Sequence, residues 1–216
     1  MGEVYATYLA SQLNNGVKSF FQFLTEQTSA LDVKFDALLK RQKPLSPDAQ
    51  EMMDEWMDGF SSDVNAFIRG EKKDPGMKKF VDQYDKIIEE HGIVLDEPLT
   101  VYRSTPHGKS VTHEGFLSTT LDPKFAVGIA AGREIPEWSE KAKEHKIMRI
   151  TIPKGTRVLP VGAKHTRGRK TGDYSGEFEI IIPRRSRLNV NPKAGKVQVG
   201  KEFRDLHDAT LESTNT

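Results

Sequence analysis

The segment YSGEFEIIIP, residues 174–183, decides the fold of this chain and indicates its chemistry. Its apolar run, Ile180–Pro183, is short and β-branched, which is typical of a buried strand. Side chains two positions apart on a strand face the same way, so we expect Glu177 and Glu179 to share one space with Cα atoms roughly 6.6 Å apart. Two carboxylates that close disfavour each other's charged form. Such a pair gains nothing for packing, but it suits a site for a cationic or electron-poor substrate.

Further strands are predicted on both sides of this segment, from about Glu97 onward, where short apolar runs alternate with turn residues. The expected strands cover residues 99–102, 115–118, 147–152, 156–161, 177–182, 187–190 and 196–199. One helix, over Pro123–Ala131 with Asp122 as its cap, is expected to interrupt them.

The first part of the chain has the periodicity of helices instead. Apolar residues recur at helical spacing from Val17 to Leu38, and Ser46-Pro47 and Asp74-Pro75 each have the cap-plus-proline pattern of a helix start. Gly92 fits a helix end. The apolar stripe of the middle helix is expected to be core and comprises Met53, Trp56, Phe60, Val64, Phe67 and Ile68.

The two patterns together predict an α+β fold: a helical N-terminal part followed by a mixed, mostly antiparallel β-sandwich. We expect a helical subdomain over residues 1–95, a core over residues 96–208 and a flexible polar tail over residues 209–216.

Composition excludes several kinds of chemistry. The 216 residues include no cysteine, so disulfides, a thiol nucleophile and cysteine–zinc sites are impossible. The six histidines lack metal-ligand spacing, and we expect no metal. There is no signal-like start and no apolar run of bilayer length. We therefore expect a protein that acts in a cytoplasm and not at a membrane, the host's cytoplasm if it is a phage protein or a delivered effector.

Two local motifs are ambiguous when taken singly, and a third can be rejected. Arg103, at a predicted strand end, can hold a phosphate or be a plain exposed charge. The hydroxyls of Ser118–Thr120 can cap the next helix or bind a substrate and a carboxylate. Gly108-Lys109-Ser110 imitates the end of a P-loop, but Arg103 stands where the loop needs glycine, so we reject that interpretation.

A basic segment surrounds the glutamate pair. Between residues 164 and 187 there are seven Lys or Arg against three Asp or Glu, on a chain whose net charge is only +1. Such a segment can steer an anionic partner, or it can be a solvated loop. A nucleic-acid binder without enzymatic activity therefore stays open as an alternative, and steep salt dependence of binding would favour it.

In their order along the chain, these motifs resemble the R-S-E class of mono-ADP-ribosyltransferases, which includes Vip2-like and iota-type toxins and enzymes of bacteriophages. The resemblance covers Leu99 to Val190: an aromatic-Arg strand, the strand of Phe116–Thr120 and a Glu-x-Glu strand. It implies the fold of that class and transfer of ADP-ribose from NAD to arginine. Two departures are Ser104, where the family has Gly, and Thr120, where it has Ser.

The resemblance also implies roles in NAD binding. Arg103 matches the arginine that binds the NAD phosphates, and the backbone of Ser104 is expected near the nicotinamide amide. Ser118 matches the serine that orders the catalytic Glu179, with Thr119 beside it. Phe125 is the candidate for the aromatic side chain that packs near nicotinamide.

The remaining implied roles concern the acceptor. Glu177 matches the carboxylate that engages the acceptor guanidinium, and Tyr174 lies in what resembles the acceptor-recognition loop. The implied partners are target proteins with an accessible arginine, proteins associated with nucleic acid among them, and we expect a monomer that uses NAD as its substrate.

Two enzymatic alternatives are weighed against transfer. A glycoside hydrolase also uses two carboxylates, but two on one face of one strand cannot readily flank a bond from opposite sides. An NAD glycohydrolase on the same fold stays open and would differ by releasing free ADP-ribose.

Overall fold

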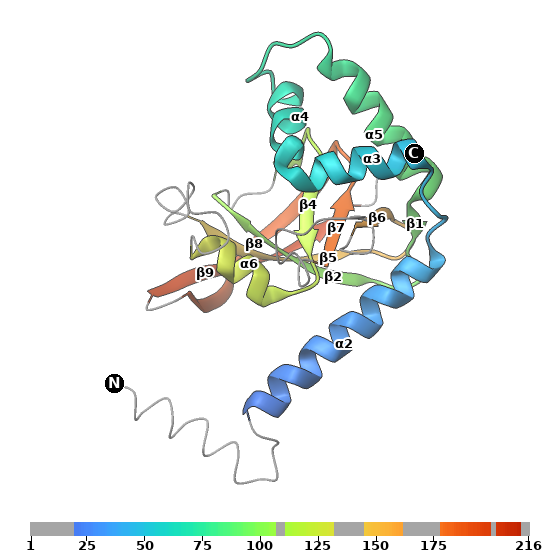
Figure 1. Cartoon of the computed structure of the whole chain (residues 1–216). Helices are drawn as coiled ribbons and strands as arrows, with labels where there is room; N and C mark the ends of the chain where they lie inside the picture. Colours follow the sequence, from blue (N-terminus) through green and yellow to red (C-terminus); the bar gives the residue numbers. More distant parts are fainter. Residues whose placement is uncertain (1–19, 107–110, 132–144, 162–177, 200–201, 213–216) are drawn as a thin grey trace.

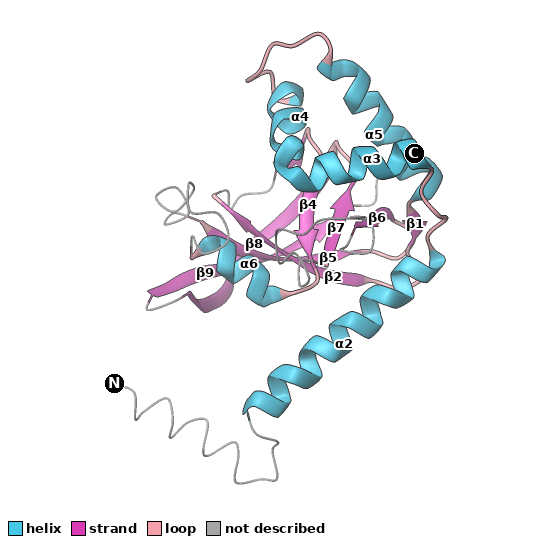
Figure 2. Ribbon diagram, in the orientation of Figure 1, coloured by secondary structure: helices cyan, strands magenta, loops and turns pink. Residues whose placement is uncertain are grey.

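A large sheet with a layer of helices forms the framework of the molecule (Figure 1). The computed structural model describes residues 20–106, 111–131, 145–161, 178–199 and 202–212. Figure 2 separates the helical N-terminal part from the strands that follow it. The predicted α+β class is confirmed.

The sheet has nine strands among the described residues, in the order β1-β6-β7-β4-β2-β5-β9-β8-β3. Their bounds are β1 Ile93–Val94, β2 Leu99–Thr105, β3 Val111–His113, β4 Leu117–Thr120, β5 Lys146–Ile152, β6 Arg157–Val161, β7 Glu179–Ile182, β8 Ser186–Val199 and β9 Glu202–Leu211. β5 and β9 pair in parallel and the other neighbours pair antiparallel, so the expected mixed sheet is confirmed.

The helices follow the start signals of the sequence in most cases. Their bounds are α2 Phe20–Arg41, α3 Pro47–Glu55, α4 Ser61–Ile68, α5 Met77–His91 and α6 Pro123–Ala130. Ser46 Oγ accepts from the Ala49 amide at 3.2 Å, and Asp122 Oδ1 accepts from the Lys124 amide at 2.8 Å. Both expected caps are therefore confirmed.

One helix begins later than its start signal predicts. α5 begins at Met77 and not directly after Asp74, because Asp74 Oδ1 accepts from the Gly76 amide at 2.9 Å and closes a local turn first. The end at Gly92 is as expected, since its amide donates to the Ile88 carbonyl at 3.0 Å.

A wide helical turn, η1 (Trp56–Phe60), joins α3 to α4. Gly59 has a φ of 99° there, a backbone conformation that side chains other than glycine's rarely adopt. The kink lets the two helices lie on the same face of the sheet, where α3, α4 and α5 gather over β4 and β7 (Figure 1).

Two hydrophobic cores lie on opposite faces of the central strands. In β7, Ile180 and Ile182 belong to a core shared with α2 and with strands from both halves of the sheet. Ile181 belongs to the second core, under α3, α4 and α5. Because side chains alternate along a strand, the isoleucine run predicted from the sequence contacts both hydrophobic cores.

The C-terminal end of the sheet differs from the expectation. β8 is one strand over residues 186–199, and β9 was not predicted. Ala209 and Leu211 are buried in β9, so residues 209–211 lie in the sheet and not in a flexible tail. The buried residues His207, Ala209 and Leu211 alternate with Asp208 and Thr210, and the charged residues of the strand hid it in a polar sequence.

The expected division at residues 95 and 96 stays a prediction, and β1 already brings Ile93–Val94 into the sheet beside β6. None of the described helices combines the length and the apolar character needed to span a bilayer.

Candidate active site

Glu179 is the first residue of β7 and lies on the face that the helices cover. It alternates with Ile180, so it faces the same way as Ile181, toward the core under α3, α4 and α5. Its side chain is buried, with 3% of the residue exposed. A buried carboxylate needs hydrogen-bond donors, and the neighbouring elements supply them.

Ser118 supplies the first donor from β4. β4 pairs with β7 in a register that places Ser118 opposite Ile181 and Thr120 opposite Glu179. The Ser118 hydroxyl donates to Glu179 Oε1 at 2.5 Å. The structure thus brings together two of the residues that the sequence motifs indicate.

Arg103 is joined to the same group from β2. Its Nη1 donates to the backbone carbonyl of Ser118. Its Nε is buried and has no hydrogen-bond partner among the described residues. An unused guanidinium N–H beside a carboxylate and a hydroxyl is what a phosphate or carboxylate oxygen would satisfy, so the residues present fit an anionic substrate.

Trp56 is a site residue that the sequence pattern assigned to the core alone. It is buried as expected, but its Nε1 donates to Glu179 Oε1 at 3.2 Å, over a sequence separation of 123 residues. The signal available in the sequence was general: a buried indole N–H needs an acceptor. Nothing in the sequence identified that acceptor as Glu179.

The environment makes the charged forms of both ionisable residues less favourable. Burial raises the pKa of Glu179, although the hydrogen bonds from Ser118 and Trp56 and the charge of Arg103 lower it. Burial likewise lowers the pKa of Arg103 to about 10, against the charge of Glu179, which raises it. Perturbation by burial together with a specific charged neighbour is typical of functional sites.

The other residues predicted to bind NAD lie near Arg103 and Ser118 in the sequence, but their side chains have partners other than Glu179. The Thr119 hydroxyl donates to the Ile180 carbonyl at 2.6 Å, so its proton ties β4 to β7. Ser104 Oγ lies 2.8 Å from His145 Nδ1. Phe125 is half-buried in the first turn of α6, which packs on β2.

The residues for the acceptor, Tyr174 and Glu177, lie outside the described residues, and their expected roles stay predictions. The prediction that one strand carries both glutamates needs correction. The strand begins at Glu179, and Phe178 has a φ of 38°, outside the extended region. Two-residue alternation therefore cannot be continued backward from Glu179 to Glu177.

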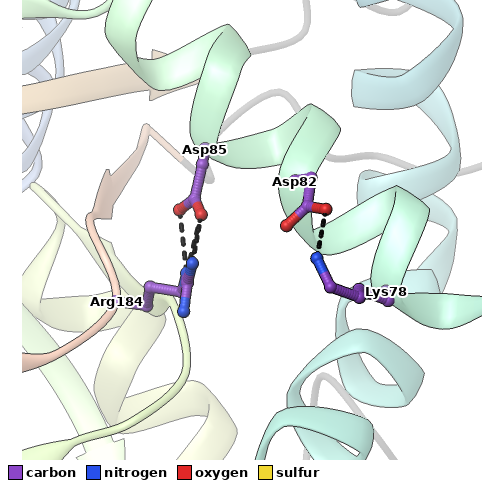
Figure 3. A network of polar contacts seen from close by, with 4 residues as sticks. All are labelled: Lys78, Asp82, Asp85 and Arg184. Carbon is purple, nitrogen blue, oxygen red and sulfur yellow. Dashed lines mark hydrogen bonds and ion pairs between the residues drawn. The ribbon is translucent and has the colours of Figure 1, made fainter.

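The other end of β7 is attached to the helical layer by an ion pair (Figure 3). Arg184 Nε donates to Asp85 of α5 at 2.7 Å, and Arg184 Nη2 lies 2.6 Å from the same carboxylate. Figure 3 also shows Asp82, one turn away, paired with Lys78 at 2.7 Å. The helices thus hold β7 at both ends, through Trp56 and through Asp85.

The basic segment is partly neutralised where the structure describes it. Arg184 pairs with Asp85, and Arg187 Nε lies 3.4 Å from Glu212. Residues 162–177 of this segment lie outside the described part. As for metals, no group of three or more possible ligands occurs within the described residues.

Comparison with known proteins agrees with this geometry. The model of the ADP-ribosyltransferase exoenzyme family matches residues 104–211, half of the 216 residues. No curated protein sequence matches the chain at a significant level. The chain belongs to the ADP-ribosyltransferase exoenzyme family and is an R-S-E class mono-ADP-ribosyltransferase, with NAD as its substrate.

Solved structures share the fold at low sequence identity. Plx2a, an ADP-ribosyltransferase toxin from Paenibacillus larvae, is 18% identical with a TM-score of 0.63, over 87% of this chain and 97% of that one. The C3 exoenzyme of Clostridium limosum is 14% identical with a TM-score of 0.58, over 86% of this chain and 95% of that one.

A larger toxin shows the same likeness over part of its length. BECa, an ADP-ribosylating toxin from C. perfringens solved with NADH, is 14% identical with a TM-score of 0.56, over 88% of this chain and 48% of that one. Matches this extensive must include the helical layer, which therefore belongs to the shared fold.

Proposed function

We propose that this enzyme transfers ADP-ribose from NAD to arginine side chains of target proteins and releases nicotinamide. The observation that carries the site assignment is the convergence of Arg103, Ser118 and Glu179 from three neighbouring strands. The arginine acceptor rests on the second carboxylate, Glu177, two residues before Glu179.

Each residue has a distinct role in this proposal. Arg103 anchors the phosphates with its unused Nε, so the rest of the substrate stays fixed while nicotinamide leaves. Glu179 hydrogen-bonds the ribose and stabilises the positive charge that develops on it. Ser118 holds Glu179 in place.

Transfer to arginine needs a further group. The bond from the ribose carbon to the nicotinamide nitrogen breaks, nicotinamide leaves as a neutral molecule, and a guanidinium nitrogen bonds to that carbon. A guanidinium is always protonated and is a poor nucleophile, so Glu177 orients it and accepts the proton that the new bond releases. Water needs less of this help, so hydrolysis of NAD depends less on Glu177.

The partners and location follow the same proposal. The acceptors are proteins with an accessible arginine in the cytoplasm of the cell where the enzyme acts, and a bacterial host of a phage is our first candidate. Tyr174 and the adjoining basic segment are proposed to contact the acceptor.

Incubation of the enzyme with labelled NAD and a bacterial lysate tests the proposal. We expect labelled bands from the wild type and none from Glu179→Gln, with mass spectrometry locating ADP-ribose on arginine. Glu177→Gln should lose the bands and keep release of nicotinamide. Label on another residue type would overturn the arginine assignment, and free ADP-ribose without bands would indicate a glycohydrolase.

A further inference from the structure

The carboxylate of Glu179 receives two hydrogen bonds on the same oxygen. Ser118 Oγ donates to Oε1 at 2.5 Å and Trp56 Nε1 donates to Oε1 at 3.2 Å. Neither bond reaches Oε2 in the part of the chain that the structure describes. The two donors come from different layers, Ser118 from the sheet and Trp56 from the helices.

We propose that Trp56 is a positioning residue that, together with Ser118, fixes Oε1 of Glu179 and leaves Oε2 as the oxygen that meets the ribose of NAD. The inference rests on the proposed role of Glu179 in transfer. It assigns a function to the helical N-terminal part, which supplies a donor to the reacting centre as well as covering the sheet.

Geometry explains why a second donor matters. The terminal torsion of a glutamate is broad, so one hydrogen bond fixes a distance and still lets the carboxylate rotate. A second donor on the same oxygen, from another direction, removes that freedom and aims the other oxygen. A reacting group must be held within about 0.5 Å of its productive position, and supporting hydrogen bonds provide this.

The indole is itself held firmly. Trp56 packs edge-on against Tyr84 and Phe116, with ring centroids 5.0 Å and 5.8 Å away. The Tyr84 hydroxyl donates to the Met52 carbonyl at 3.0 Å, which fixes the cluster to α3. Trp56 is 2% exposed. This packing gives the indole N–H one direction, toward Glu179.

The chemistry of the donor suits its position. An indole N–H is neutral, so it stabilises the charged carboxylate without supplying a positive charge that would oppose the one developing on the ribose. A lysine or arginine in the same place would pair with Glu179 and compete with the substrate. Among the described residues, the positive charge that acts on Glu179 is that of Arg103 from β2.

Other charged groups near the site act indirectly. Arg69, after α4, acts on Arg103 and lowers its pKa, after the larger effect of burial. Burial and then Glu55 raise the pKa of Tyr84, so that phenol stays neutral. The hydrogen bond from Trp56 lowers the pKa of Glu179 against burial. Loss of the indole donor must therefore raise the pKa of Glu179 further.

Trp56→Phe tests the role, with Tyr84→Phe as the matched control in the same aromatic cluster. For Trp56→Phe we expect kcat to fall roughly ten- to hundredfold, the size of effect of losing a supporting hydrogen bond behind a reacting group. The acid limb of the pH–rate profile should move to higher pH. Tyr84→Phe loses a buried hydrogen bond but should keep the acid limb of the wild type. An unmoved acid limb in Trp56→Phe, with a kcat loss no larger than that of the control, would overturn the inference.

A second readout needs no NAD. The chain has two tryptophans, Trp56 and Trp138, so Trp138→Phe leaves Trp56 as the only indole emitter. Its emission should titrate with Glu179, because a charge appears at the indole N–H, and Glu179→Gln should remove that titration. Emission that does not titrate in the folded protein overturns the inference whatever the activity. A titration without NAD turnover by the wild type supports the contact and overturns the proposed function instead.

Discussion

Two arginine–carboxylate sets on the same sheet behave in opposite ways. The outer set is the pair of Arg149 and Asp208. Arg149 Nε and Nη2 donate to Asp208 at 2.7 Å and 2.9 Å, and the side chains are 44% and 41% exposed. In the site, Arg103 and Glu179 are close enough to influence each other's pKa, yet no salt bridge joins them among the described residues. The outer pair satisfies itself, whereas the inner pair keeps bonding capacity for a substrate.

The directions of the pKa shifts express this difference. The hydrogen bonds between Arg149 and Asp208 raise the pKa of the arginine and lower that of the aspartate, since exposure makes burial a minor effect. At the site burial dominates, lowers the pKa of Arg103 and raises that of Glu179. Substitutions matched between the two sets should therefore differ in kind as well as in size.

Arg103→Lys should impair NAD use far more than any matched substitution of the Arg149–Asp208 pair. Lysine keeps the charge but lacks the planar fork of donors that reaches both the Ser118 carbonyl and a phosphate. We expect kcat/KM for NAD to fall roughly 30-fold or more, about 2 kcal/mol or more. Steady-state kinetics measure this, with Arg149→Lys as the control that should leave the constants near those of the wild type. Equal losses in both variants would remove the distinction between the two sets.

Asp85→Asn tests a pair whose exposure lies between that of the outer set and that of the site. Arg184 and Asp85 are 23% and 36% exposed and join β7 to α5. Loss of the charge should lower the free energy of unfolding by about 1–3 kcal/mol, because Arg184 loses charge-assisted hydrogen bonds. Denaturant unfolding measures this, with Asp82→Asn as the control, which breaks the exposed pair with Lys78 and reaches Arg184 through its charge alone, without a hydrogen bond. A larger loss in the control would contradict the assignment of Asp85 as the attachment.

Glu179→Gln should abolish transfer and yet stabilise the fold. A folded-state pKa above the unfolded value means that ionisation of Glu179 opposes folding, so wild-type stability is highest below the unfolded pKa and falls as pH rises through the folded pKa. The amide oxygen can still accept from Ser118 and Trp56. We expect a gain of about 0.5–2 kcal/mol near neutral pH that shrinks as the pH falls. Thermal unfolding across pH measures it, and a loss at neutral pH would contradict the direction.

The sequence predicted the parts of this site that depend on local pattern and order. The isoleucine run placed β7, and the motif order brought Arg103, Ser118 and Glu179 to adjacent strands. Trp56 was predicted to be buried, since helical periodicity fixes the face of a residue, but no periodicity names a partner 123 residues away.

Two other features could not be predicted from sequence patterns, for a different reason. Phe178 has a positive φ of 38°, and its buried ring packs against Phe35 of α2, with centroids 5.5 Å apart. Propensity rules expect glycine at such a position. β9 was missed because charged residues, Asp205 and Asp208 among them, interrupt its few apolar ones, and only the pairing with β5 and β8 makes it a strand.

Asp208→Asn should give the smallest effect and the opposite sign to Glu179→Gln. The lowered pKa of Asp208 means that its charge stabilises the fold above the unfolded pKa, and this contribution is lost as pH falls through the folded pKa. Because the pair is exposed, solvent screens it and we expect a loss of only about 0–1 kcal/mol near neutral pH. The same thermal unfolding series measures both variants, with added salt reducing the Asp208 effect more than the Glu179 effect. A stabilising Asp208→Asn, or equal salt dependence, would mean that burial does not separate the two sets.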